Sequence, residues 1–415
     1  MDILQIVIMV AQALAVTLFI TTGFAYLTWY ERRLLARFQH RVGPNRAGPM
    51  GLLQPVADAV KLFFKEDIIP SAADRGVYLL APVLAVMTAI VIWAVLPLGC
   101  FNLNGDHTAC FDVARQGELN NILQIADVNI GILFLLAVTS VGVYGITLAG
   151  WASNSKYAML GGIRSSAQLI SYELAFGMAV LSVVMFGGTL STWEIVHAQE
   201  GLWFYAPLVL GFVLFMIGAT AELVRAPFDL VEAEQELTSG YNTEYGSMKF
   251  ALFFMSEYMK MIAMSAIATT LFLGGWRFPG LEMLGNGVAE LAGPWAAMVV
   301  VGIISLLSFL GKIALFLFVF VWLRASWPRM RYDQLMEFGW KSLLPLAIVN
   351  LTVIPVVLVL VPDNRWLQAI ILFVFGIGSL LIASRVGNLP KPKMRKAQLV
   401  QTTRTEHQQQ TGSIG

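Results

Sequence analysis

Long apolar runs alternate with short polar segments along this chain. Nine runs hold about 20 mostly apolar residues, the length that crosses ~30 Å of hydrocarbon at ~1.5 Å per residue. They are continuous and lack the period-2 alternation of barrel strands. The pattern predicts an all-α membrane protein, a polytopic bundle with spans at about 3–29, 76–98, 125–148, 163–186, 203–224, 250–273, 295–323, 342–361 and 366–384. We expect one transmembrane bundle over 1–385 and a cytoplasmic, disordered tail at 386–415, rich in Gln and Thr.

The polar segment after the first run contains a further helix, at about residues 50–65. Its apolar residues, among them Val56, Val60, Phe63 and Phe64, recur at spacings of three and four. A helix too short to span lies in the plane of the membrane interface. A surface anchor and a portal for an amphiphile both fit this pattern. Asp58 favours the portal, because an anchor needs no carboxylate near its apolar face.

Lysine and arginine positions predict the orientation. Loops after the odd-numbered spans, together with the tail, hold 22 of these residues, whereas the opposite side holds only Arg115, Arg277 and Arg365. Cytoplasmic loops are the ones enriched in Lys and Arg. We therefore expect the N-terminus outside and the C-terminus in the cytoplasm. The first run follows an acidic Asp2 and is too long for a signal peptide, so it is predicted to remain as a span.

Composition narrows the function. The chain of 415 residues is 57% hydrophobic and 13% charged, with a net charge of +1, which leaves no basic face for nucleic acid. Its two cysteines, Cys100 and Cys110, share one outer loop, where a disulfide can form. The sequence contains no CxxC motif, no metal-spaced His and Cys set and no phosphate-binding glycine loop. We expect no metal site and no redox cofactor within this chain.

Acidic residues gather in the polar segment 221–246. Six carboxylates stand there against one basic residue: Glu222, Asp229, Glu232, Glu234, Glu236 and Glu244 against Arg225. On a helix, Asp229, Glu232 and Glu236 would share one face, where like charges disfavour one another's ionised form and can relay protons. A solvated acidic loop remains the alternative. The interleaved Pro227 and Phe228 favour the relay.

Four charges lie within predicted spans, namely Glu173, Glu257, Lys260 and Lys312. Each costs roughly 2.5 to 3.5 kcal/mol at the centre of a span, so all four must face the bundle or water. Glu257 and Lys260 are three residues apart and can pair on one helix. Proton relay is the hypothesis for the others.

Several strings resemble one known family. They are ERR (31–33), GPNRAGPMGLLQPVADAVKLFFKED (43–67), GWASNSKYAMLGGIRSSAQLISYE (150–173), AELVRAPFDLVEAEQELTSGYNTEYG (221–246), FFMSEY (253–258) and RASWPRMRYDQLM (324–336). In this order they are similar to the heel subunit in the membrane arm of NADH-quinone oxidoreductase, which is respiratory complex I. This bacterial family is the counterpart of the mitochondrial NADH dehydrogenase subunit 1.

The resemblance implies a membrane subunit of a proton-pumping NADH:quinone oxidoreductase in the bacterial inner membrane. Such a subunit forms the lipid-side part of a quinone tunnel and an acidic path that couples quinone reduction to proton translocation. Its substrate is ubiquinone or menaquinone. FMN and iron–sulfur clusters, and with them NADH oxidation, belong to partner subunits of the peripheral arm, which supply the rest of the quinone site. Small membrane-arm subunits and membrane lipid are the other expected partners.

The matched motifs assign residues to these two roles. Quinone binding is expected of Arg32, Arg41, Arg46, Asp58, Phe64, Arg324 and Arg329. The proton path is expected of Glu173, Glu222, Arg225, Asp229, Glu232, Glu234, Glu236 and Glu257. No residue of this chain alone is expected to be catalytic.

The sequence departs from the family pattern in three places. A ninth span and the tail extend beyond the family's eight-helix form, the loop with Cys100 and Cys110 is not a shared motif, and Lys260 stands beside the matched Glu257. Two alternatives stay open. The related heel subunit of a membrane-bound hydrogenase shares several loops, although the complete 43–67 segment favours a quinone user. A stand-alone transporter would also bury charges, but the chain shows no internal repeat.

Overall fold

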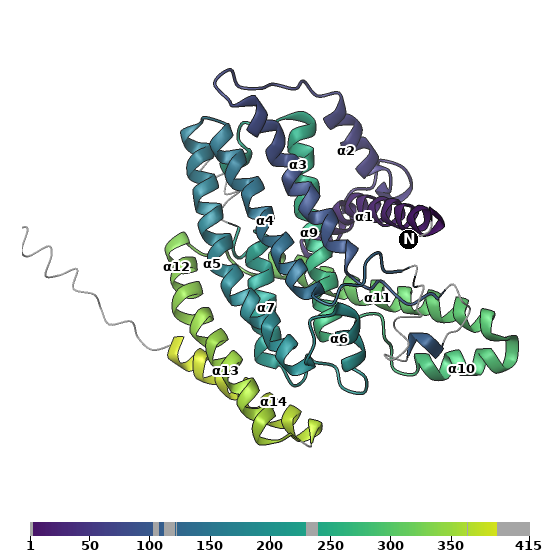
Figure 1. Cartoon of the computed structure of the whole chain (residues 1–415). Helices are drawn as coiled ribbons and strands as arrows, with labels where there is room; N and C mark the ends of the chain where they lie inside the picture. The colour runs from purple at the N-terminus through teal and green to yellow at the C-terminus, as the bar shows by residue number, and fades with distance from the viewer. Residues whose placement is uncertain are drawn as a thin grey trace, which may run out of the picture.

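The described part of the protein is a bundle of helices (Figure 1). The computed structural model describes residues 3–102, 108–111, 121, 123–229, 240–362 and 364–387. Within these residues eight helical segments are long and apolar enough to cross a membrane. Their main helices are α1 (Ile3–Phe38), α3 (Arg75–Val91), α4 (Gly131–Ala152), α5 (Lys156–Gly187), α9 (Ser247–Phe272), α11 (Pro294–Ser326), α13 (Leu344–Leu360) and α14 (Arg365–Gly387). The predicted all-α membrane fold is confirmed.

Five shorter α-helices accompany them in the described residues. They are α2 (Gln54–Phe63), α6 (Thr192–Ala198), α7 (Val209–Glu222), α10 (Leu281–Ala292) and α12 (Tyr332–Phe338). The run expected to span at 203–224 contains α7, whose 14 residues extend about 21 Å because residues 204–208 form turns. A π-helical segment, Gly339–Leu343, joins α12 to α13, so this helical segment starts before residue 342. The predicted tail, from residue 388 onward, lies outside the described residues.

Helix α1 continues past residue 29 to Phe38. Arg and Leu, which dominate residues 31–38, favour helix, and residues 31–42 contain no Gly or Pro. The extension places Glu31, Arg32 and Arg33 on the helix rather than in a loop. Glu31 thereby faces the protein interior, where 1% of its surface is exposed.

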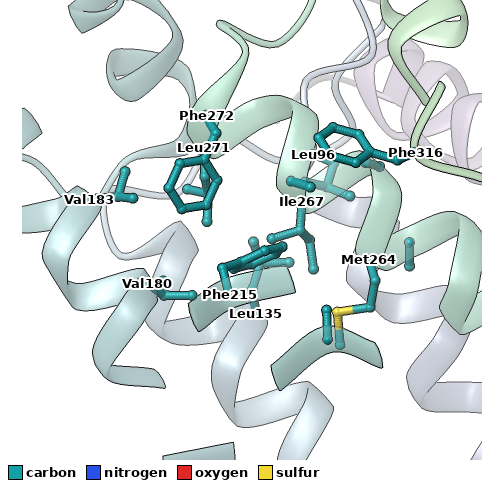
Figure 2. Packing of buried hydrophobic residues seen from close by; sticks show 14 of the residues in the cluster. Leu96, Leu135, Val180, Val183, Phe215, Met264, Ile267, Leu271, Phe272 and Phe316 are labelled. Atoms are coloured by element: carbon teal, nitrogen blue, oxygen red, sulfur yellow. The ribbon is translucent and has the colours of Figure 1, made fainter. Parts of the chain in front are cut away.

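The core of the bundle forms around α9. Figure 2 shows Ile267 and Phe272 of α9 among side chains from other helices, including Val183 of α5, Phe215 of α7 and Phe316 of α11. Small residues bring helices close together, as is typical in membranes. A Cβ atom on Gly150 of α4 would lie 2.7 Å from a backbone oxygen of α5. Side chains larger than glycine would push these two helices apart.

The loops separate into two groups at opposite ends of the helices. At one end, Asp74 N donates to Ala152 O (3.2 Å) and Tyr78 Oη donates to Glu244 O (2.7 Å). These contacts bring together the start of α3, the end of α4 and the segment before α9, at the end of the bundle that the charge count assigns to one side. At the other end, Thr192 Oγ1 donates to Val95 O (2.8 Å). Cys100 and Cys110 at that end form a disulfide with Cα atoms 5.9 Å apart.

A cavity at the membrane surface and a buried charge network

A cavity of about 630 Å³ lies between α1, α2 and α9. Aromatic side chains from all three helices line it, among them Phe24, Phe63, Phe64, Phe250 and Phe254. None of the residues of α2 is fully buried, so this helix lies on the surface of the bundle, over the cavity. The cavity suits a long, largely apolar molecule.

Both ends of α2 are fixed to the neighbouring helices. At its start, Trp29 Nε1 and Arg33 Nη1 of α1 donate to Met50 O, at 3.2 and 3.3 Å. At its end, Ser247 Oγ of α9 lies 3.0 Å from both Leu62 O and Lys65 O, with the carbonyls accepting. The turn that precedes α2 requires glycine at position 51. Its φ is +77°, and a Cβ there would lie 2.3 Å from Pro44 O.

Two polar side chains meet on the wall of the cavity. Arg32 Nη1 of α1 lies 2.6 Å from Asp58 Oδ2 of α2, and Gln54 Nε2 donates to Asp58 Oδ1 at 3.2 Å. The structure thus places three expected quinone-site residues, Arg32, Asp58 and Phe64, on one cavity.

Two other expected residues lie elsewhere. Arg41 and Arg46 are exposed in the segment after α1 and do not line this cavity. Arg41 Nε donates to Gln39 Oε1 at 2.7 Å. Arg41 and Arg46 are therefore available for contacts outside this chain and not for contacts in the cavity.

A buried charge network lies directly behind the cavity. Glu31 Oε1 lies 2.7 Å from Arg225 Nη1, and Arg324 pairs with the same carboxylate. Arg225 Nε lies 2.8 Å from Glu257 Oε1, and its guanidinium sits 4.5 Å from the centre of the Tyr258 ring. The network joins α1, α9, α11 and the segment after α7. It contains three residues expected in the site, Arg225, Glu257 and Arg324.

Arg225 remains a cation in this setting. Burial alone would lower its pKa, but the carboxylates of Glu257 and Glu31 outweigh burial and raise the pKa above its usual value. A buried guanidinium is tolerated only where carboxylates compensate for its lost hydration. Arg225 therefore carries a permanent positive charge. This charge influences the protonation of Glu31 and Glu257, which lie next to it.

The segment after α7 is held by α5 and by the segment after α11. Gln168 Nε2 of α5 donates to Ala221 O and Phe228 O, at 3.1 and 2.9 Å. Asp229, 6% exposed, pairs with Arg329 at 2.7 Å between Oδ2 and Nη2. The expected residues Asp229 and Arg329 thus contact each other.

Further into the bundle lie two expected carboxylates and a lysine. Glu173 of α5 accepts a hydrogen bond from Ser140 Oγ of α4. Glu222, at the end of α7, is 8% exposed and lies within electrostatic reach of Lys260 and Glu173. Lys260 in turn interacts with both Glu222 and Glu257. The helical pair of Glu257 with Lys260 that their spacing allows is not formed; the carboxylate of Glu257 lies 2.8 Å from Arg225 Nε instead.

Three expected residues, Glu232, Glu234 and Glu236, lie at 230–239, outside the described residues. One central residue, Glu31, is absent from the expected set. A predicted span ending at residue 29 left Glu31 in a polar loop. Its position within ERR, one residue before an expected quinone ligand, is the signal that could have identified it.

Lys312 of α11 has a structural role. Its Nζ donates to Leu273 O, Gly275 O and Arg277 O at 2.7, 2.8 and 2.7 Å, which satisfies carbonyls at and beyond the C-terminus of α9. An ammonium group has three donors, so these bonds occupy all of them. The relay hypothesis for Lys312 loses its basis.

The fold and the site define a class: a multi-pass α-helical membrane protein with an apolar cavity between its helices and a buried network of carboxylates and arginines. Comparison with known proteins names the family. The family model described as NADH dehydrogenase matches residues 11–355. The H subunit of the NADH-quinone oxidoreductase of Deinococcus deserti is 46% identical over 385 residues, covering 92% of each chain.

Two further relatives agree. An H subunit of the NADH-quinone oxidoreductase of Geobacter sulfurreducens is 47% identical over 84% of this chain and 94% of its own. The H subunit of Rhodospirillum rubrum is 47% identical over 83% of this chain and 91% of its own. This chain belongs to the H-subunit family of NADH-quinone oxidoreductase, and it is a multi-pass bacterial membrane subunit of complex I. The matches set aside the hydrogenase and transporter alternatives.

Proposed function

We propose that this subunit admits quinone from the membrane through the cavity between α1, α2 and α9, and that the buried charge network behind it couples quinone reduction to proton translocation. One observation supports both parts. Arg32 lines the cavity, and its chain neighbour Glu31 pairs with Arg225 and Arg324 inside the protein. A change of charge next to Arg32 in the cavity therefore acts on the buried network across two adjacent residues of α1.

The lining of the cavity suits the isoprenoid tail of ubiquinone or menaquinone. Each buried methylene contributes ~0.8 kcal/mol, and the aromatic walls bind any long apolar tail without selecting one headgroup. Arg32 and Asp58 supply the polar contacts that a headgroup meets on its way inward.

The proton path runs through the carboxylates of the interior. Glu257 and Glu31 share Arg225, whereas Glu222 and Glu173 lie beyond Lys260. Glu31, Glu257 and Glu222 each lie near at least one cation, so a change in one charge alters the free energy of protonating the next. Glu232, Glu234 and Glu236 belong to the same acidic segment of the sequence and are assigned to the proton path in this proposal.

The end of the bundle that carries α2 and the 240–247 segment faces the cytoplasm in this proposal, with the N-terminus outside. Most lysines and arginines of the loops are at this end. The exposed Arg41 and Arg46 suit contact with the peripheral-arm subunits that carry FMN and the iron–sulfur clusters. The membrane is the bacterial inner membrane.

Filling the cavity tests the proposal. Ala59 of α2 lines the cavity, whereas Ala57 of the same helix is exposed and does not. We expect Ala59→Trp to lower NADH:quinone turnover of the purified complex, while Ala57→Trp leaves turnover unchanged. NADH oxidation by an artificial acceptor should stay normal in both, because it bypasses the membrane arm. Equal quinone turnover in the two variants would contradict a quinone path through this cavity.

A further inference from the structure

Lys260 occupies an unusual position in the interior of the bundle. It projects from α9 toward α3 and α4, and its ammonium group lies against residue 142, which is a glycine. A Cβ atom on Gly142 of α4 would lie 2.9 Å from Lys260 Nζ and 3.1 Å from Thr88 Oγ1 of α3. Three helices therefore form one notch around the end of this side chain.

The charges around the notch give Lys260 two acidic neighbours on different elements. Glu257 lies one turn earlier on α9, and Glu222 ends α7. Both interact electrostatically with the ammonium group. Glu257 already contacts Arg225, and Glu222 also responds to Glu173. Lys260 thus stands between the acids next to the cavity network and those deeper in the bundle.

The ammonium group does not contact either carboxylate directly. Among the described residues, Lys260 forms no ion pair within 4.0 Å, although Glu257 and Arg225 do. If Lys260 served only to neutralise Glu257, we would expect the two side chains to form an ion pair on α9, because residues at i and i+3 lie on the same helix face. The notch holds the cation away from a simple pair and within reach of both acids.

We propose that Lys260 is a positioning residue of the proton path: its ammonium group, seated in the notch at Gly142, links Glu257 to Glu222 electrostatically. The proposal rests on the proposed function, since it assigns a role within the same path. Protonating either acid removes its attraction for the shared cation, so the flexible lysine side chain moves closer to the acid that stays ionised and stabilises its negative charge. The protonation states of Glu257 and Glu222 are then coupled through Lys260 rather than independent of each other.

A double-mutant cycle in the assembled complex tests this role. Lys260→Met keeps the length and removes the charge, and Gly142→Ala places a methyl group against Nζ. We expect either substitution to lower the number of protons pumped per NADH and quinone turnover about fivefold, within the range of coupling between neighbouring groups. Gly177→Ala is the control, because nothing lies within 4 Å of the added methyl group on α5.

The decisive comparison is Gly142→Ala in the background of Lys260→Ala. If the notch serves only to seat the lysine, the added methyl group should have little further effect once the lysine is gone. An undiminished effect of Gly142→Ala in that background would overturn the proposal, because it would assign Gly142 to helix packing alone. Normal pumping by an assembled Lys260→Met complex would overturn it as well.

These outcomes are separable from failure of the proposed function. If Glu222→Gln abolishes pumping while Lys260→Met pumps normally, the path stands and the role of Lys260 falls. If both variants pump normally, the proposed path itself is wrong. Native electrophoresis of each variant confirms that the whole complex is compared.

Discussion

Glu31 and Arg225 form a buried ion pair that joins α1 to the segment after α7, with 2.7 Å between Glu31 Oε1 and Arg225 Nη1. The side chains are 2% and 5% exposed, and Arg225 holds Glu257 at the same time. Such a pair adds little net stability by itself, but removing one partner leaves an uncompensated charge in the interior. The pair therefore fixes where α1, and with it the wall of the cavity, meets the charge network.

Arg225→Met should destabilise the subunit by about 3 to 5 kcal/mol, because Glu257 loses its partner in a buried setting. Arg225→Lys should restore only part of this, since one ammonium cannot reach two carboxylates as a planar guanidinium does. The thermal midpoint of the purified complex measures the effect. Lys341→Met is the control: its pair with Glu337 is exposed and should contribute only ~0.3 to 0.5 kcal/mol. Equal losses at the buried and exposed pairs would contradict this account of the network.

Glu222→Gln should lower quinone reduction and proton pumping together, by at least about tenfold, because an amide cannot bind and release a proton during turnover. The amide keeps the shape of the side chain at the end of α7, so the complex should assemble. Glu290→Gln on the exposed face of α10 is the matched control and should be silent. Unchanged turnover in an assembled Glu222→Gln complex would remove this residue from the path.

Lys312→Met should reduce the amount of assembled complex without changing the protons pumped per NADH. The substitution leaves three carbonyls near the end of α9 without their donor, at a cost of about 3 kcal/mol or more. Quantifying the complex on native gels alongside pumping in vesicles separates the two effects. Normal abundance with lost pumping would make Lys312 a relay candidate again.

The sequence predicted the bundle well because about 20 apolar residues in a row have few other solutions in lipid. It placed the end of α1 too early, since polar residues after residue 29 remain helical at the membrane surface. The sequence also did not predict which side chains from different helices would pair. The pairing of Glu257 with Arg225 rather than Lys260, and the role of Lys312, depend on which helices pack together. The motif positions were informative for Arg32, Asp58 and Phe64, which share one cavity, but not for Arg41 and Arg46, which face outward.

Cysteine labelling can determine the orientation of the subunit in the membrane. Both native cysteines are joined in a disulfide, so a single introduced cysteine is the only thiol of this chain that reacts with a maleimide. Glu282 of α10 and Arg385 of α14 are exposed, and the charge count assigns them to opposite sides. In intact spheroplasts, an impermeant maleimide should label Glu282→Cys and spare Arg385→Cys.

After permeabilisation, the reagent should label both variants, which serves as the control for reactivity. The physical reason is the membrane-insertion bias that retains Lys- and Arg-rich loops in the cytoplasm. The opposite pattern, with Arg385→Cys labelled in intact spheroplasts, would invert the subunit. The cavity, α2 and the exposed arginines after α1 would then face away from the NADH-oxidising arm, and the proposed coupling between the two arms would lose its geometric basis.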